Sequence, residues 1–262
     1  MAVALQKTED SLPGPQPGRE GVRNDWVPET LFGTWFLSTG MWRRHVLPPA
    51  IEELAQLLGP VGRISRILDV GCGRGQALPL LAQQFSPELL IGVEVDPDLI
   101  AGAAKAAKAC DCAVKILTGE ATKLDLSDRS VDLVFCHQTM HHLRHQEAAA
   151  REFFRVLKPG GTLLFAESCR AFIYSLWIRL LFRHPMEVQK SAEEYLALLA
   201  TAGFTFESRH ISRPRPPWSR PDIGLLDLIG RGYKKPFPDP LVFVAARRPD
   251  ETAPMSNPAR AE

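Results

Sequence analysis

The residues whose types and spacing suggest chemistry form one stretch, Ile67-Leu68-Asp69-Val70-Gly71-Cys72-Gly73-Arg74-Gly75. An apolar run that predicts a buried strand leads into glycine at every second position, and leucines at helical spacing follow from Leu78. A strand, a glycine turn and a helix in this order are typical of a loop that binds a nucleotide. Glycine permits a sharp turn and a close approach of the backbone to a ligand, and the free N–H groups of the helix can bind polar atoms.

The spacing of the glycines separates two kinds of nucleotide loop. The dinucleotide fingerprint Gly-x-Gly-x-x-Gly requires a glycine where this chain has Gln76. The pattern that is present, Asp-x-Gly-x-Gly-x-Gly from Asp69 to Gly75, resembles the first motif of the class I S-adenosylmethionine-dependent methyltransferases. The resemblance implies an α/β fold, a Rossmann-like three-layer sandwich with a seven-stranded, mostly parallel sheet, and S-adenosyl-L-methionine as the cofactor. It assigns cofactor contacts in this loop to Asp69, Gly71, Cys72, Gly73 and Gly75.

Two further segments match the cofactor motifs of that family. The apolar run from Glu88 to Asp96 predicts a second strand, and the resemblance places Glu94 at the ribose hydroxyls. Asp96 is the alternative, although its position before Pro97 favours a helix cap. After a third strand, Glu120 and Ala121 match the acid and the small residue that contact adenine in the family. The resemblance also places Val95, Cys136 and His137 beside the cofactor.

Histidines follow the predicted fourth strand, in the segment His137-Gln138-Thr139-Met140-His141-His142-Leu143. Open α/β sheets bind ligands at the carboxyl ends of their strands, so this segment should line the crevice where methyl donor and acceptor meet. His137, or secondly His141, is a candidate general base because imidazole titrates near neutrality. The alternative is that they only shape the pocket. No carboxylate or cysteine joins the histidines at ligand spacing, so we predict no metal site.

Other segments define the extent of the domain. Arg155 to Gly161, Arg-Val-Leu-Lys-Pro-Gly-Gly, is a family signature that predicts a helix end, a tight turn and the start of a fifth strand. A sixth strand is expected over 204–211 and the last, antiparallel strand over 241–246. The predicted domain order is a disordered tail (1–25), an N-terminal helical cover (26–59), the methyltransferase domain (60–248) with an inserted lid helix (168–190), and a second disordered tail (249–262).

The acceptor should be recognised outside the shared core. Trp35 and Trp42 in the cover, and Phe172 and Trp177 in the inserted apolar helix, are the candidate substrate residues, although aromatic residues serve packing equally well. The apolar helix over 171–183 carries Ser175, Arg179 and Arg183 four residues apart, which predicts a narrow polar stripe. It could be a lid, a membrane contact, a dimer surface or simply a packed helix.

Composition restricts the classes of partner. The chain has 262 residues, 31 basic and 30 acidic, so a nucleic-acid binder that relies on a broad basic face is not expected. Five cysteines without a framework spacing indicate reduced thiols and a cytoplasmic protein; Cys110-Asp111-Cys112 lacks a second pair that would complete a metal site. No apolar run reaches the length of a transmembrane helix, and no export signal is visible. Peripheral membrane contact and a monomeric or homodimeric state remain possible.

The sequence therefore predicts methyl transfer by in-line displacement to a small apolar or aromatic acceptor, at carbon or oxygen. Two alternatives come from other classes. One is a non-catalytic S-adenosylmethionine-binding module with a regulatory or interaction role. The other is a nicotinamide-dependent oxidoreductase, against which Gln76 argues.

Overall fold

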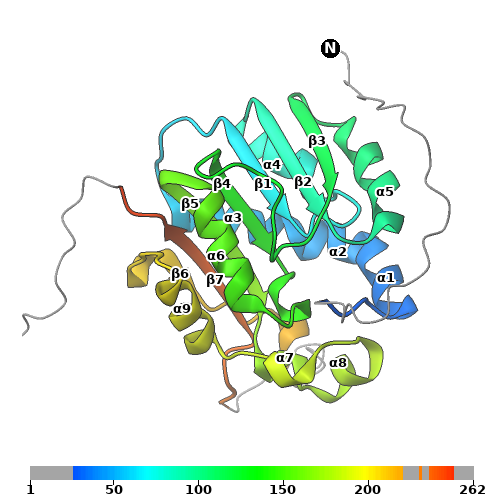
Figure 1. The fold of residues 1–262 in the computed structure, drawn as a ribbon. Coiled ribbons are helices and arrows are strands. Elements are labelled where there is room, and N and C mark those ends of the chain that lie inside the picture. Colours follow the sequence, from blue (N-terminus) through cyan, green and yellow to red (C-terminus); the bar gives the residue numbers. More distant parts are fainter. Residues whose placement is uncertain (1–25, 221–229, 232–235, 251–262) are drawn as a thin grey trace, which may run out of the picture.

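The protein, in a computed structural model that describes residues 26–220, 230–231 and 236–250, is built around one seven-stranded sheet (Figure 1). The strand order is β3-β2-β1-β4-β5-β7-β6. Six of the strands run in the same direction, and β7 lies antiparallel between β5 and β6. The strands are β1 (Arg66–Val70), β2 (Leu89–Glu94), β3 (Ala113–Thr118), β4 (Val131–His137), β5 (Leu157–Ser168), β6 (Ile211–Ser212) and β7 (Leu241–Arg247). This confirms the predicted architecture.

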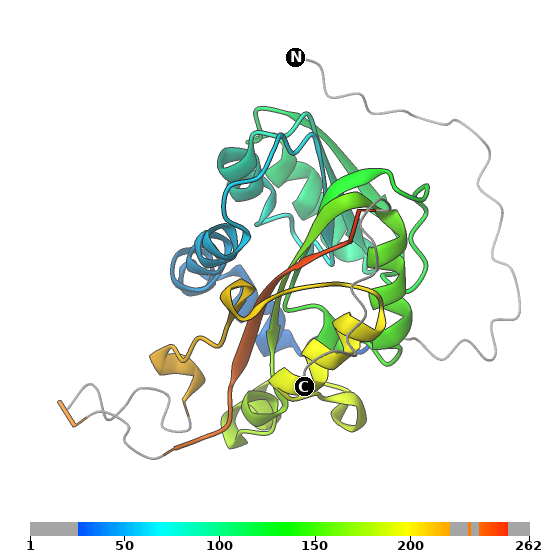
Figure 2. The same ribbon diagram turned by 90° about the vertical axis from the view of Figure 1, so that its left-hand side faces the viewer.

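The central strands are apolar on both sides because each side faces a separate hydrophobic core. Ile67 and Leu133 point to the core beneath α3 (Leu47–Leu58) and α4 (Leu78–Phe85). Their neighbours Leu68 and Val134 point to the core beneath α6 (Gln146–Val156) and α9 (Ala192–Thr201). Helices therefore cover both faces, and the edge-on view in Figure 2 shows the sheet between them. Alternation along each strand explains why these segments read as continuous apolar runs.

Polar side chains cap the N-termini of three helices. Thr30 caps α1 (Leu31–Ser38) by accepting the N–H of Gly33 at 3.0 Å. Asp96 caps α5 (Pro97–Ala107), with Pro97 in the first turn, as the sequence indicates. Ser191 and Glu194 form a capping box at α9.

The N-terminal segment packs over the carboxyl ends of the strands. Trp26 pairs with Leu143 in an isolated bridge, and the N–H of Val27 donates to the carbonyl of His142 at 3.1 Å. α1 and α2 (Gly40–His45) follow before α3 begins at Leu47. Helices α1 to α3 thus follow this segment, and it packs at the edge of the sheet where the strands end.

The inserted segment differs from the predicted single helix. It forms two short helices, α7 (Arg170–Ile173) and α8 (Leu176–Leu181), separated at Tyr174 and Ser175. No residue of α8 is buried, and Leu176 and Leu180 are 75% and 70% exposed. The hydrogen bonds of α7 end when Tyr174 and Ser175 close its last turn, so a continuous polar stripe along 171–183 does not form.

The sixth strand is shorter than predicted. Ser208–His210 form a 3₁₀ turn, only Ile211 and Ser212 pair with β7, and Thr205 pairs with Arg247 as an isolated bridge. An edge strand is defined by its pairing rather than by its own pattern, so its limits were the least predictable. The predicted tail over 1–25 and residues 251–262 of the predicted tail over 249–262 lie outside the described residues.

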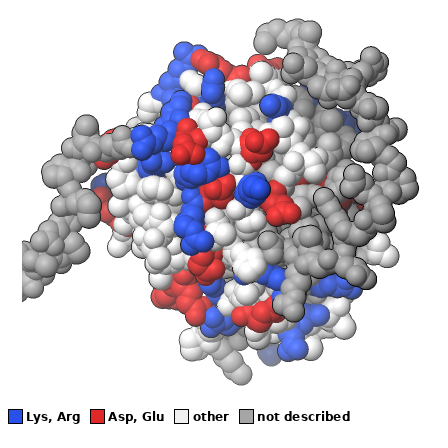
Figure 3. Space-filling view, viewed as in Figure 1, with Lys and Arg blue, Asp and Glu red and all other residues white. Residues whose placement is uncertain are grey.

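Charged side chains of both signs are interspersed on the face shown in Figure 3, in agreement with the balanced composition. Within the described parts of the chain, no helix combines the length and the apolar character that a membrane span requires.

Candidate functional site

A cavity of about 430 Å³ lies at the carboxyl ends of β1, β2 and β4, beneath the N-terminal cover. This is within the usual range for a small-molecule site. Its walls come from the glycine loop, the end of β2, the segment after β4, and α1 to α3. The described lining residues are Trp26, Val27, Pro28, Glu29, Thr34, Trp42, Leu47, Asp69, Gly71, Cys72, Gly73, Arg74, Gln76, Ala77, Glu94, Val95, Asp96, Asp98, Leu99, Phe135, His137, Gln138, Thr139, His142 and Leu143.

The glycine loop needs its glycines for different reasons. Gly71, Gly73 and Gly75 all have positive φ angles, of 71°, 54° and 74°. A Cβ on Gly71 would lie 2.4 Å from Thr139 Oγ1, and one on Gly75 would lie 2.8 Å from the Cα of Ala103. A Cβ on Gly73 would meet no atom within 4 Å. Two of the glycines therefore allow close packing, and Gly73 leaves open space beside the cavity.

Glu94 holds the loop in this shape. Its Oε2 accepts the N–H of Gly73 at 2.7 Å, and its Oε1 accepts those of Val95 and Asp96 at 2.9 and 3.0 Å. Each carboxylate oxygen can accept more than one hydrogen bond, so Glu94 can also bind hydroxyl groups of a ligand.

Asp69 lies at the end of β1 beside Glu94. It is buried, and its Oδ2 has no hydrogen-bond partner among the described residues. Burial, and secondly the Glu94 carboxylate, raise the pKa of Asp69 to about 8. An unpartnered carboxyl oxygen in a cavity wall is an acceptor or donor for a polar ligand.

The raised pKa of Asp69 predicts a pH-dependent stability. An unfolded aspartate has a pKa of about 4, so between about pH 4 and pH 8 the folded state retains a proton that the unfolded state has lost. The stability contributed by the protonated group is therefore present at low pH and lost as pH rises towards 8. Asp69→Asn has no carboxyl group to ionise and so lacks this loss. We therefore expect the difference between the thermal midpoints of the variant and the wild type to increase in favour of the variant between about pH 5 and about pH 8. Thermal unfolding without ligand measures this, and a constant difference would contradict it.

A smaller cavity of about 40 Å³ adjoins the first and shares Trp26, Gly71 and Thr139 with it. Glu120 and Ala121 line it together with Gly119. The two cavities thus bring the predicted ribose acid and the predicted adenine residues to one side of the glycine loop.

His137 lines the large cavity at the end of β4. Its ring stacks on Phe135 with centroids 5.9 Å apart, Trp42 contacts it at 5.6 Å, and its Nε2 has no partner among the described residues. Burial lowers the pKa of His137 to about 4, although the Glu167 carboxylate acts in the opposite direction. The imidazole is therefore neutral at physiological pH and a weak base.

His141 does not line the cavity among the described residues. Its Nδ1 lies 2.7 Å from Glu167 Oε2 inside the protein. The other carboxylate oxygen, Oε1, accepts the N–H groups of Thr139 and Met140, both at 2.7 Å. Glu167 thereby fixes the backbone after β4, which positions His137 and Thr139 at the cavity.

Comparisons with known proteins agree with this geometry. Residues 68–165 match a family model described as a methyltransferase domain. This stretch of the chain is similar to methyltransferase domains.

Known relatives resemble this domain rather than the whole chain. Phosphoethanolamine N-methyltransferase 3 of Arabidopsis thaliana is 29% identical over 143 residues, 55% of this chain and 28% of that protein. A Schizosaccharomyces pombe protein described as an uncharacterized methyltransferase is 37% identical over 117 residues, 44% of each chain. The chain thus spans less than a third of the length of the plant relative.

A solved structure has the same fold. It is described as a complex between the Haloferax volcanii Trm112 methyltransferase activator and a methyltransferase. It superposes with a TM-score of 0.63 at 20% identity, covering 85% of this chain and 97% of that one.

The matched region brings most of the predicted cofactor residues together. Asp69, Gly71, Cys72, Gly73, Glu94, Val95 and His137 line the large cavity, and Glu120 and Ala121 line the small one. Gly75 and Cys136 lie behind the walls, and Cys136 is fully buried in the core. Of the predicted substrate residues only Trp42 lines the cavity. Trp35 is 60% exposed, Trp177 is 48% exposed, and Phe172 packs on Trp218.

An aromatic chain connects the inserted segment to the cavity. Phe182 follows α8 and contacts Phe36 edge-on at 5.8 Å; Phe36 contacts Trp42 at 6.1 Å, and Trp42 contacts His137. Thr30 also donates its hydroxyl to the carbonyl of Leu181 at 2.6 Å. The insertion is therefore fastened to α1 rather than to the cavity itself.

Sequence reasoning missed residues whose roles depend on folding. Glu29 and Trp26 line the cavity although they lie far from every motif in the sequence. Glu167 did carry a signal, because it is an acid that directly follows the apolar run Leu163–Ala166 in β5.

Proposed function

We propose that this protein transfers a methyl group from S-adenosylmethionine to a small acceptor bound in the large cavity. The cavity carries the proposal, because it joins the glycine loop, an acid at the end of β2 and an unpartnered histidine at the end of β4. Glu94 would bind the ribose hydroxyls, Glu120 and Ala121 the adenine, and Asp69 with Gly71 to Gly75 the remaining polar groups. The open space at Gly73 and the orphaned Asp69 Oδ2 fit a ligand of this kind.

The charge of the cavity supports this cofactor over a dinucleotide. Five described lining residues carry a carboxyl group and one carries a guanidinium: Glu29, Asp69, Glu94, Asp96, Asp98 and Arg74. Carboxylates favour a cationic sulfonium and disfavour a pyrophosphate. The oxidoreductase reading is therefore poorly supported.

Catalysis would rest mainly on positioning. When bound, S-adenosylmethionine supplies a methyl group on a positively charged sulfonium, which is already activated for displacement. His137 presents a neutral imidazole, and a pKa of about 4 makes it a poor base for a hydroxyl group. Accepting a hydrogen bond that orients the acceptor is the role that its environment favours. His141 lies outside the cavity wall and would act only through its contact with Glu167.

The lining of the acceptor side favours an apolar or aromatic molecule, methylated at carbon or oxygen. Trp42, Leu47 and Phe135 lie there beside His137. A phosphorylated acceptor like the one in the plant relative's name would require cationic groups, and Arg74 is the one Lys or Arg among the described lining residues. The alternative is a module that binds the cofactor without turnover.

Calorimetric titration with S-adenosylmethionine and with NAD tests the ligand. We expect binding of the former alone, and binding of NAD alone would overturn the proposal.

Incubation with methyl-labelled cofactor and a metabolite extract tests turnover. Label transferred to an extractable, apolar product is expected; cofactor binding without any transfer would favour the non-catalytic module.

A further inference from the structure

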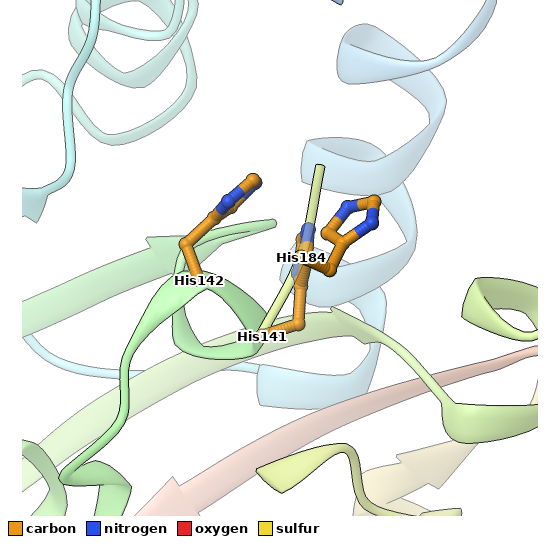
Figure 4. Close-up of side chains that lie close together, drawn as sticks. All are labelled: His141, His142 and His184. Atoms are coloured by element: carbon orange, nitrogen blue, oxygen red, sulfur yellow. The ribbon is translucent and has the colours of Figure 1, made fainter. Parts of the chain in front are cut away.

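Three histidines, one of which lines the cavity, cluster at a place where the sequence predicted no metal. His141 and His142 come from the segment after β4, and His184 comes from the segment after α8 (Figure 4). Their ring centroids lie 4.3, 5.1 and 5.0 Å apart, and their potential ligand atoms all lie within 4.8 Å of one another. Folding therefore assembles a set of donors that no local spacing reveals.

A carboxylate lies beside two of the three histidines. Glu29 Oε1 lies 3.2 Å from His142 Nε2 and 3.9 Å from His184 Nε2. The reason for expecting no metal was the lack of a carboxylate near the histidines. Glu29 is more than 100 residues away in sequence and is supplied by the N-terminal cover.

Neighbouring acceptors orient two of the imidazoles. His142 Nδ1 lies 3.1 Å from the carbonyl of Val27, which can only accept, so this nitrogen carries a proton. His141 Nδ1 lies 2.7 Å from Glu167 Oε2, and donation to that carboxylate sets the same tautomer. Both rings then present the lone pair of Nε2. Metal-binding histidines characteristically donate their second ring nitrogen to a carbonyl or carboxylate in this manner.

We propose that His141, His142, His184 and Glu29 bind a divalent transition metal ion such as Zn²⁺. Three imidazole nitrogens and one carboxylate oxygen form a complete tetrahedral set for this ion. Bonds of about 2.0–2.1 Å place tetrahedral ligands about 3.3 Å apart, so the three histidine ligand atoms, which lie within 4.8 Å of one another, need to close by at most about 1.5 Å. Glu29 Oε1 already lies 3.2 and 3.9 Å from the Nε2 atoms of His142 and His184.

The ion would have a structural role, because it would connect separate segments of the chain. The four ligands belong to three segments: the N-terminal cover, the turn after β4 and the loop that follows α8. Glu29 and His142 also line the large cavity. A bound ion would therefore lock the cover and the insertion onto the end of β4, and so fix one wall of the cavity. This role does not depend on the identity of the methyl acceptor.

The test uses full-length, tag-free protein in a Cys110→Ser/Cys112→Ser background, which removes the other candidate thiol ligands. After treatment with EDTA, Zn²⁺ is titrated against a chromogenic chelator, and thermal midpoints are measured with and without the ion. We expect one equivalent bound and a raised midpoint. His184→Gln and Glu29→Gln should each weaken Zn²⁺ binding by at least about 10- to 100-fold. The exposed His45→Gln should leave the affinity unchanged.

A second measurement covers the case in which a ligand variant is poorly folded. Co²⁺ bound to the otherwise unaltered background protein should show the strong visible absorption of a tetrahedral ion, without a sulfur charge-transfer band. The absence of stoichiometric binding, an octahedral Co²⁺ spectrum, or equal Zn²⁺ affinity in the folded ligand variants would overturn the proposal. The cluster would then be held by hydrogen bonds alone. S-adenosylmethionine affinity is measured separately, so a failure of the metal site and a failure of the proposed activity are distinguishable.

Discussion

Replacement of Gly73 with valine should weaken S-adenosylmethionine binding by about 10- to 100-fold, the equivalent of about 1–3 kcal/mol for overfilling a site. Gly73 lines the cavity, and a Cβ there meets no protein atom within 4 Å, so the valine methyl groups would occupy space left for the ligand. The fold should survive, because the added atoms displace no packed side chain. Calorimetric titration gives the affinity, and circular dichroism checks the fold.

Two alanine variants separate bulk from backbone strain. Gly73 has a φ of 54°, where any residue with a Cβ loses roughly 1–2 kcal/mol. Gly73→Ala carries this strain with less bulk, and we expect an intermediate loss of affinity. Gly59→Ala, at the positive-φ end of α3 and outside the cavity wall, should reduce stability and leave binding unchanged. Unchanged affinity in Gly73→Val would refute the assignment of the loop.

Glu94→Gln should reduce both cofactor affinity and stability, the latter by about 2–3 kcal/mol. The Glu94 carboxylate accepts three backbone N–H groups, and glutamine would turn an N–H₂ group towards at least one of these donors. The glycine loop would lose hydrogen bonds that hold its shape, and the ribose hydroxyls that we propose Glu94 binds would lose a charged acceptor. Affinity should fall about 10- to 100-fold, because hydrogen bonds to charged groups contribute about 1.5–3 kcal/mol.

Asp96→Asn is the matched control. Asp96 also lines the cavity, but its side chain accepts the N–H of Asp98 as the cap of α5, and asparagine caps helices equally well. We expect a change in affinity of about threefold or less. An equal or larger effect in Asp96→Asn would transfer the ribose site from Glu94 to Asp96. Titration and denaturant unfolding of both variants, side by side, decide between them.

The sheet and the glycine loop were predictable because their signals are local. A strand buried on both faces must be apolar throughout, and a turn with positive φ angles must contain glycine, so β1, β2 and the loop between β1 and α4 are visible in the sequence alone. The position of Glu94 at the carboxyl edge of the sheet was predictable as well, because Glu94 is the last residue of the parallel strand β2.

The rest depends on contacts that no local pattern encodes. Glu29 meets His142 and His184 across more than 100 and 150 residues, so only the packed cover brings the carboxylate to the imidazoles. The break between α7 and α8 was not predictable, because the sequence of an exposed apolar segment does not differ from that of a buried apolar helix. Trp35 and Trp177 were candidates for the cavity for the same reason, since residue type does not tell which face an aromatic side chain will occupy.

Aromatic contacts run from the exposed helix α8 to the cavity. They connect Phe182, at the end of this helix, through Phe36 and Trp42 to His137. Leu176 and Leu180 face outwards, whereas the end of their helix is fastened to α1 through Thr30 and Phe36. Packing therefore connects this surface, through Phe36 and Trp42, to the imidazole of His137 in the cavity wall. If binding of a partner to this surface moved these rings, it would change the affinity of the cavity for its ligand, and the ligand would change the affinity for the partner by the same factor.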